Sequence, residues 1–113
     1  MSGRASRRKG HQWERDVANR FKEVFGRDKV RRGLQYREGA ECPDVVAPCF
    51  WIECKRRKQT NPRAALRQAI EDSGGKGFWP LAVCKDDGQP AFVSMTLDDF
   101  LELVTEWWAV RSA

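Results

Sequence analysis

The stretch "PDVVAPCFWIECK", residues 43–55, places two acids and a lysine inside an otherwise apolar run. An apolar run bounded in this way is typical of a buried part of a folded domain. Burying a charged group costs free energy unless another group pairs with it. The positions of Asp44, Glu53 and Lys55 therefore need an explanation.

Two short apolar groups within this stretch predict a pair of strands. Residues 45–47 and 50–52 are apolar, and Pro48 and Cys49 separate them. A tight β-hairpin is the simplest structure for this pattern, because proline is tolerated at turns and strand ends. We therefore expect two adjacent strands that turn near Pro48.

Strand geometry brings the three charged side chains together. Successive side chains of a strand point to opposite faces, so Glu53 and Lys55 share one face. The hairpin returns the start of its first strand, at Asp44, to the end of its second. Two carboxylates this close repel unless a proton or a cation lies between them, and their oxygens favour Mg²⁺ or Mn²⁺. A lysine beside such a metal suits the hydrolysis of a phosphodiester bond.

A structural role is the alternative for this short D-x₈-E-x-K pattern. Glu53 and Lys55 would then be an exposed ion pair at a sheet edge, and Asp44 would be a turn residue. The context favours a site, since Lys55 leads directly into the basic residues 56–58. A basic cluster at that place suits the backbone of a nucleic acid.

Basic residues are concentrated in the first half of the chain. Lys and Arg number 21 against 16 Asp and Glu. Residues 1–62 carry 16 basic and 8 acidic side chains, whereas residues 63–113 carry 5 and 8. Such asymmetry predicts a polyanionic partner, nucleic acid first, because phosphates bind Lys and Arg through counterion release. A surface that only aids solubility is the alternative.

Length and composition favour one cytoplasmic domain. A chain of 113 residues suits a single modest core. No apolar run approaches the roughly 18 residues of a membrane span, and none follows the basic N-terminus as in a secretory signal. The four cysteines include no C-x-x-C pair, and His11 is the one histidine, which argues against structural zinc. We expect reduced thiols, since disulfides are rare in the cytoplasm.

The rest of the pattern predicts helices and strands around a central sheet. Helices are expected at residues 10–25, 62–73 and 97–108, a strand or bent hairpin at 29–37, and strands at 78–85 and 90–95, in addition to the central hairpin. Asn61 and Thr96 are in place to cap the second and third helices. The order α, β, β, β, α, β, β, α predicts an α/β fold with a mixed sheet flanked by helices.

The two ends of the chain carry separate expectations. Residues 1–9 have four basic side chains and only small apolar ones, which predicts a mobile basic arm before a single domain at residues 10–113. The last helix is apolar over more than one face. This excess favours a homodimer formed through that helix or through the sheet.

These motifs resemble the PD-(D/E)XK nucleases, and among them the small archaeal-type Holliday junction resolvases and their phage relatives. The resemblance rests on "PD" at residues 43–44, "ECK" at residues 53–55 and "KGHQWERD" at residues 9–16. It spans about residues 9–95 and implies the restriction-endonuclease-like fold. One departure is the segment "REGAEC" before Asp44, which has Gly39 but lacks the serine usual in archaeal resolvases.

The resemblance also implies roles for particular residues. Asp44, Glu53 and the backbone carbonyl of Cys54 would ligate Mg²⁺ or Mn²⁺, Glu14 would approach the same site directly or through water, and Lys55 would position the attacking water. Expected DNA contacts are Arg8, Lys9, Arg15, Arg31, Arg32, Arg56, Arg57, Lys58 and Gln68. Either Arg31 or Arg32 would face the site, and an exposed helix glutamine is the alternative for Gln68.

Taken together, the sequence predicts a Mg²⁺-dependent endonuclease that resolves four-way DNA junctions by paired phosphodiester hydrolysis. A homodimer fits, because two symmetric cuts require two active sites. The alternatives are another DNA nuclease of the same fold, such as a restriction-like or repair nicking enzyme, and a DNA-binding protein that keeps the fold without catalysis. An interaction protein built on the Trp-rich last helix is a third alternative.

Overall fold

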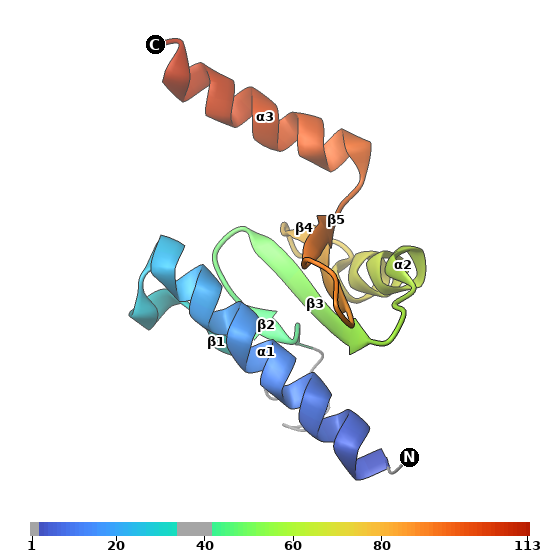
Figure 1. Cartoon of the computed structure of the whole chain (residues 1–113). Helices are drawn as coiled ribbons and strands as arrows, with labels where there is room; N and C mark the ends of the chain where they lie inside the picture. The colour runs from blue at the N-terminus through green and yellow to red at the C-terminus, as the bar shows by residue number, and fades with distance from the viewer. Residues whose placement is uncertain (1–2, 34–41) are drawn as a thin grey trace.

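A computed structural model describes residues 3–33 and 42–113 of the chain. Its elements in order are α1 (Gly3–Phe25), the 3₁₀ helix η1 (Arg27–Lys29), β1 (Arg31–Arg32), β2 (Val45–Val46), β3 (Phe50–Arg57), α2 (Pro62–Ser73), β4 (Trp79–Asp86), β5 (Phe92–Ser94) and α3 (Leu97–Arg111). The predicted order of helices and strands is confirmed, with η1 added after the first helix (Figure 1).

Within the described residues the strands form a mixed sheet in the order β1-β2-β3-β4-β5. The strands β1, β2 and β3 are antiparallel neighbours, β4 runs parallel to β3, and β5 is antiparallel to β4. The predicted hairpin is confirmed, since Val45 pairs with Ile52. Its turn places Cys49 in the left-handed region at φ 71°, and the N–H of Phe50 donates to the carbonyl of Pro48 at 2.8 Å.

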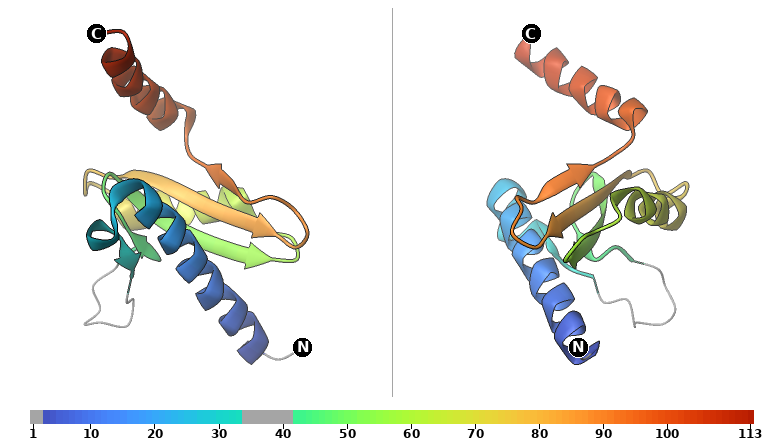
Figure 2. Two further views of the ribbon diagram at one scale, coloured as in Figure 1. Left: turned by 60° about the vertical axis from the view of Figure 1, so that its left-hand side comes forward. Right: turned by 45° about the vertical axis from the view of Figure 1, so that its right-hand side comes forward.

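Different helices cover the two faces of the sheet (Figures 1 and 2). Ile52 and Cys54 of β3 pack in a core with α1, whereas Ala65 of α2 packs against the opposite face. Because side chains alternate along β3, Glu53 and Lys55 point to the α2 face. The predicted alternation is therefore confirmed, and it sets the charged residues apart from the larger core.

The first helix is longer than the sequence indicated. It begins at Gly3, so residues 3–9 are helical where we expected a mobile arm. Arg, Lys and Ala are good helix formers, and extending a helix that packing has already nucleated requires no new nucleus. Trp13 and Val17 of this helix are buried, whereas Val24 is 77% exposed.

Some expectations concern residues at the margin of the described part. The strand β1 spans Arg31–Arg32, which is shorter than the expected strand or hairpin at residues 29–37. Residues 34–41, which include Gly39 and most of the "REGAEC" segment, lie outside the described residues. Cys49, Cys54 and Cys84 are free thiols in the structure. No helix in the described ranges is long and apolar enough to cross a membrane.

Both predicted helix caps are confirmed. The side chain of Asn61 accepts a hydrogen bond from the N–H of Ala64, and that of Thr96 accepts one from the N–H of Asp99. The two caps fix where α2 and α3 begin. Unlike α2, α3 stands apart from the sheet and from α1 in every view (Figures 1 and 2).

Gly33 lies where two backbone segments pass close together, and this predicts a clear effect of substitution. A Cβ there would come within 1.8 Å of the Pro43 carbonyl oxygen. We expect Gly33→Ala to lower the free energy of unfolding by about 1–3 kcal/mol through overpacking, measured by urea denaturation. Gly10→Ala in α1 is the control, because its Cβ would meet nothing within 4 Å. That control should be stable or slightly stabilised, and equal stability of both variants would contradict the prediction.

Candidate functional site

The hairpin places the carboxyl groups of Asp44 and Glu53 in contact inside the protein. Asp44 is 8% exposed and Glu53 is 1% exposed. The N–H of Asp44 donates to the carbonyl of Ile52, and the N–H of Cys54 donates to Asp44 Oδ2, at 2.9 and 2.8 Å. A hydrogen bond also joins the two carboxyl groups. The predicted convergence of these acids is therefore present in the structure.

Burial decides how the two acids are protonated. It raises the pKa of the Glu53 carboxyl to about 8, and the charge of Asp44 adds to this rise, while the indole of Trp51 opposes it. Burial also raises the pKa of Asp44, against the lowering effect of the Cys54 N–H. At neutral pH one proton therefore remains with the pair, on Glu53, because two adjacent buried carboxylates cannot both ionise freely.

Trp51 is a site residue that the sequence reasoning missed. Its indole N–H donates to Glu53 Oε2 at 3.0 Å in a buried contact. Its ring packs edge-on against Phe78, and the ammonium of Lys76 lies 4.7 Å from the ring centre. The signal was available, since the alternation that pairs Glu53 with Lys55 puts Trp51 on the same face. The indole holds the Glu53 carboxyl in one orientation.

Glu14 on α1 lies near the acid pair and is held by an arginine. Arg32 Nη2 lies 3.0 Å from Glu14 Oε1, and the charge of Glu14 raises the pKa of Asp44. Arg32 Nε is buried and has no hydrogen-bond partner in the described part of the chain. Arg31 is exposed and donates to the Arg32 carbonyl. Of the two arginines left open by the sequence, Arg32 is therefore the one beside the acids.

Lys55 and Gln68 line one hollow of about 320 Å³ between the end of β3 and α2. Arg57, Gln59 and Asn61 also line this hollow. Lys55 lies close enough to Asp44 for its charge to lower that pKa. The structure thus brings Gln68 to the same side of the sheet as Lys55, although Gln68 remains exposed.

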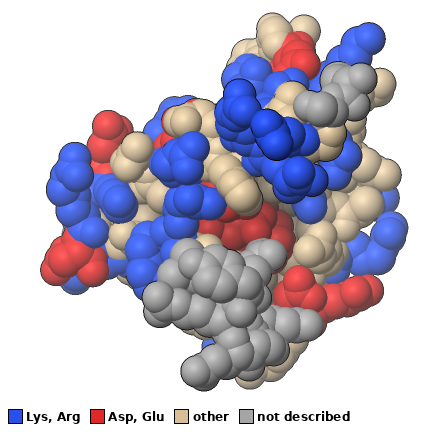
Figure 3. Space-filling model, turned by 90° about the horizontal axis from the view of Figure 1, so that it is seen from below, with Lys and Arg blue, Asp and Glu red and all other residues tan. Residues whose placement is uncertain are grey.

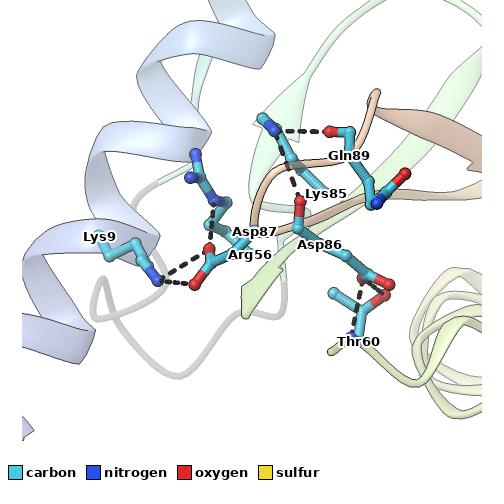
Figure 4. A network of polar contacts seen from close by, with 7 residues as sticks. All are labelled: Lys9, Arg56, Thr60, Lys85, Asp86, Asp87 and Gln89. Carbon is cyan, nitrogen blue, oxygen red and sulfur yellow. Dashed lines mark hydrogen bonds and ion pairs between the residues drawn. The ribbon is translucent and has the colours of Figure 1, made fainter. Parts of the chain in front are cut away.

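Lys9 and Arg56 meet at Asp87, a residue that the sequence reasoning did not single out (Figure 4). Lys9 Nζ lies 3.0 Å and Arg56 Nε 3.3 Å from Asp87 Oδ1. The hydrogen bond from Lys9 lowers the pKa of Asp87. Arg56 lies on the face of β3 opposite Lys55, so the basic residues 56–58 are divided between two faces. Next to Asp87, Asp86 accepts a hydrogen bond from the Thr60 N–H.

The other predicted DNA contacts lie on the surface without converging on the acids. Arg8, Arg15, Arg31, Arg57 and Lys58 are exposed, and Arg15 Nη2 donates to Gln12 on its own helix at 3.2 Å. Seen from below, the molecule presents acidic side chains at the centre of a face with Lys and Arg around them (Figure 3). This arrangement suits the binding of a polyanion, because basic side chains would hold it beside an acidic, metal-dependent centre.

The donor set fits a hard divalent cation, but it is incomplete. No group of three or more His, Cys, Asp or Glu side chains in residues 3–33 and 42–113 is arranged to hold a metal ion. Glu14 stands in its ion pair with Arg32 instead of joining the acids. The pair of Asp44 and Glu53 nevertheless offers carboxylate oxygens where one proton now offsets their repulsion. A divalent cation could take the place of that proton.

Comparison with known proteins places the chain in a family. A family model described as "Phage putative PDDEXK endonuclease" matches residues 5–110. The chain belongs to this phage endonuclease family. Nucleases of the PD-(D/E)XK type generally use divalent metal ions, in keeping with the acids at the site. No curated protein gives a significant match.

The fold is similar to that of a solved nuclease structure. This is Hjc, a Holliday junction resolvase from the archaeal hyperthermophile Archaeoglobus fulgidus, with a TM-score of 0.56 and 22% sequence identity. The similarity covers 77% of this chain and 72% of that chain. The predicted α/β, restriction-endonuclease-like fold is confirmed.

The raised pKa of Glu53 predicts a pH-dependent stability of the metal-free protein. The folded state keeps this proton up to about pH 8, whereas an ordinary glutamate has a pKa of 4.5, so stability falls as pH rises between these values. In EDTA at pH 8, Glu53→Gln should raise Tm by a few degrees, because roughly 4 °C corresponds to about 1 kcal/mol in a domain of this size. At pH 5 the gain should be small.

The exposed acid Glu71 provides the matched control for that experiment, since Glu71→Gln changes the net charge equally. Thermal denaturation followed by circular dichroism measures both variants. A gain of the same size for Glu53→Gln at pH 5 and pH 8 would show that the raised pKa is not its cause.

Trp51 predicts a second effect at the same carboxyl group. Trp51→Phe keeps an aromatic ring but removes the N–H that bonds Glu53. We expect the Mg²⁺ concentration for half-maximal cleavage to rise about 10-fold or more, as for other residues that orient metal ligands. Trp79→Phe is the control, because its indole N–H donates to exposed Glu102 of α3 and not to the acid pair. Equal effects of the two substitutions would exclude a positioning role for Trp51.

Proposed function

We propose that this protein is a Mg²⁺-dependent, structure-selective DNA endonuclease that cleaves four-way junctions as a homodimer. The observation that carries the proposal is the buried pair of Asp44 and Glu53, which shares a proton beside Lys55. Membership of an endonuclease family supports the reaction. The similarity of fold to a Holliday junction resolvase favours branched DNA over linear duplex as the substrate.

Asp44 and Glu53 would hold the metal ion, with the backbone carbonyl of Cys54 as a further oxygen ligand. These are the hard oxygen ligands that Mg²⁺ prefers. When bound, the ion would polarise the scissile phosphate and lower the pKa of a bound water. The elevated pKa of Glu53 supports this assignment, because a carboxyl pair that keeps a proton when free is relieved of its repulsion by a cation.

The remaining site residues would position groups and offset charge. Lys55 would hold the attacking water and stabilise negative charge on the phosphate. Trp51 would keep the Glu53 carboxyl aligned through its N–H. Arg32, paired with Glu14, is partly exposed and would donate to a phosphate oxygen from the accessible part of its guanidinium group.

The DNA backbone would lie across the basic side chains around the acids. We assign this role to the basic residues Arg8, Lys9, Arg15, Arg31, Arg56, Arg57 and Lys58, and we assign a neutral DNA contact to Gln68. Asp87 supports the assignment of Lys9 and Arg56, because it holds the two cations side by side. Contacts of this kind recognise the shape of a junction and do not distinguish one base sequence from another. A two-fold dimer would supply the second active site for a paired cut.

Cleavage of a panel of DNA substrates tests the function directly. Purified protein with Mg²⁺ should cut four-way junctions in preference to linear duplex, single strands and flaps. Equal cutting of linear duplex would contradict the junction preference and favour a restriction-like or nicking enzyme. Binding of junctions without cleavage of any DNA, in Mg²⁺ and in Mn²⁺, would favour a non-catalytic DNA-binding protein.

Substitution of site residues separates metal binding from water activation. Asp44→Asn and Glu53→Gln should abolish cleavage and also the Mg²⁺-dependent rise in Tm, while junction binding in a gel-shift assay persists. Lys55→Met should lower the cleavage rate by roughly 10²–10⁴-fold and keep the Mg²⁺-dependent rise. Arg67→Met, an exposed cation on α2, is the matched control and should cleave normally. Loss of the Mg²⁺-dependent rise in Lys55→Met would refute this division of roles.

A further inference from the structure

The last helix has an apolar surface that its own chain leaves uncovered within the described residues. No residue of α3 is buried. Its large exposed side chains are Leu97 (69%), Phe100 (47%), Leu101 (49%), Trp107 (54%), Trp108 (60%) and Val110 (79%). An isolated helix of this length is only marginally stable in water, and helices in proteins are stabilised by packing of an apolar face. The α3 helix therefore needs a partner surface.

A second uncovered apolar surface lies between α1 and β5. It is a groove of about 380 Å³ whose lining includes Phe21, Val24, Phe92 and Val93. Val24 is 77% exposed and Val93 is 53% exposed. The strand β5 is also an edge of the sheet, where a strand has unpaired backbone groups. The protein thus exposes an apolar helix and an apolar groove at the same time.

Charge makes the helix and the groove complementary. The α3 helix carries four acidic residues and one basic residue, whereas α1 carries seven basic and three acidic residues. Arg20 of α1 lines the groove itself. An acidic apolar helix is therefore attracted to the basic helix that forms one wall of the groove.

The accessible surface area of the chain supports a large interface. The chain exposes 8026 Å², although a monomer of 13.0 kDa is expected to expose about 6,300 Å². The excess, roughly 1,700 Å² for one chain, is about twice the roughly 800 Å² that each partner buries in a standard interface, which suits a chain that takes part in two contacts. Covering α3 and the groove would bring the chain towards the surface of an ordinary globular protein.

We propose that two copies of this chain exchange their α3 helices, each helix lying in the groove between α1 and β5 of the other copy. The chain's own α3 stands apart from α1 in every view (Figures 1 and 2), and the indole N–H of Trp79 donates to Glu102 of α3 at 3.0 Å. A second copy satisfies both surfaces with two identical contacts related by a two-fold axis. The inference names the interface of the proposed homodimer and does not depend on catalysis.

Mass measurement by light scattering after size-exclusion chromatography tests the exchange. The wild-type protein should have twice the 13.0 kDa mass of one chain. A helix variant, Leu101→Glu with Trp108→Glu, and a groove variant, Val24→Glu with Val93→Glu, should each raise the dissociation constant by at least about 10-fold. Ile70→Glu is the control, because Ile70 lies on the exposed side of α2, and this variant should remain a dimer.

Mixing the two variants identifies the occupant of the groove. The helix variant keeps an intact groove, and the groove variant keeps an intact α3 helix. A mixture of the two should therefore form a mixed dimer in which one intact helix lies in one intact groove. A monomeric wild type, a groove variant that remains a dimer, or a mixture that stays monomeric would each overturn the exchange. A groove variant that remains a dimer would instead indicate that two α3 helices pair with each other.

Circular dichroism checks that each variant folds. If a double variant unfolds, the milder Leu101→Gln and Val93→Thr repeat the same comparison. Because the readout is mass, a failed exchange leaves the proposed metal-dependent cleavage untouched, although a monomeric wild type would also contradict the proposed homodimer. An inactive enzyme leaves the exchange untouched.

Discussion

The hydrogen-bond register between β2 and β3 is the constraint on which the candidate site depends. Val45 opposite Ile52 places Asp44 beside Glu53, and the N–H of Cys54 then reaches the Asp44 carboxylate. A slip of one residue would turn every side chain of β3 to the other face, burying Lys55 against α1 and moving Glu53 away from Asp44. The apolar residues of the hairpin therefore do more than form a core, because they select the register that brings the acids together.

The parts that could be predicted from the sequence are those fixed by local chemistry. The convergence of Asp44, Glu53 and Lys55 follows from strand alternation and one turn, both of which span a few residues. The caps at Asn61 and Thr96 are equally local, as is the order of helices and strands. In each case the side chain and the backbone group that it contacts lie close in sequence, so spacing alone was sufficient.

The parts that could not be predicted depend on contacts between distant segments. Asp87 binds Lys9, which lies 78 positions earlier in the chain. The choice of Arg32 over Arg31 depends on which side of β1 faces Glu14. A charged residue next to another of the same kind carries no periodic signal, so the sequence left that choice open. The exposure of α3 is likewise a tertiary property, since its apolar pattern is the one that a buried helix would have.

The buried acid pair also affects the stability of the metal-free protein and the free energy of metal binding. Two carboxyl groups in contact, one of them protonated with its pKa raised to about 8, destabilise the metal-free chain at neutral pH. The long parallel pairing of β3 with β4, packed on both faces, fixes the position of Glu53 in the sheet. Folding has thus already brought the two carboxyl groups together. A cation that replaced their proton, as proposed above, would meet two oxygen donors already in contact, whereas Glu14 would have to leave its ion pair with Arg32 to join them.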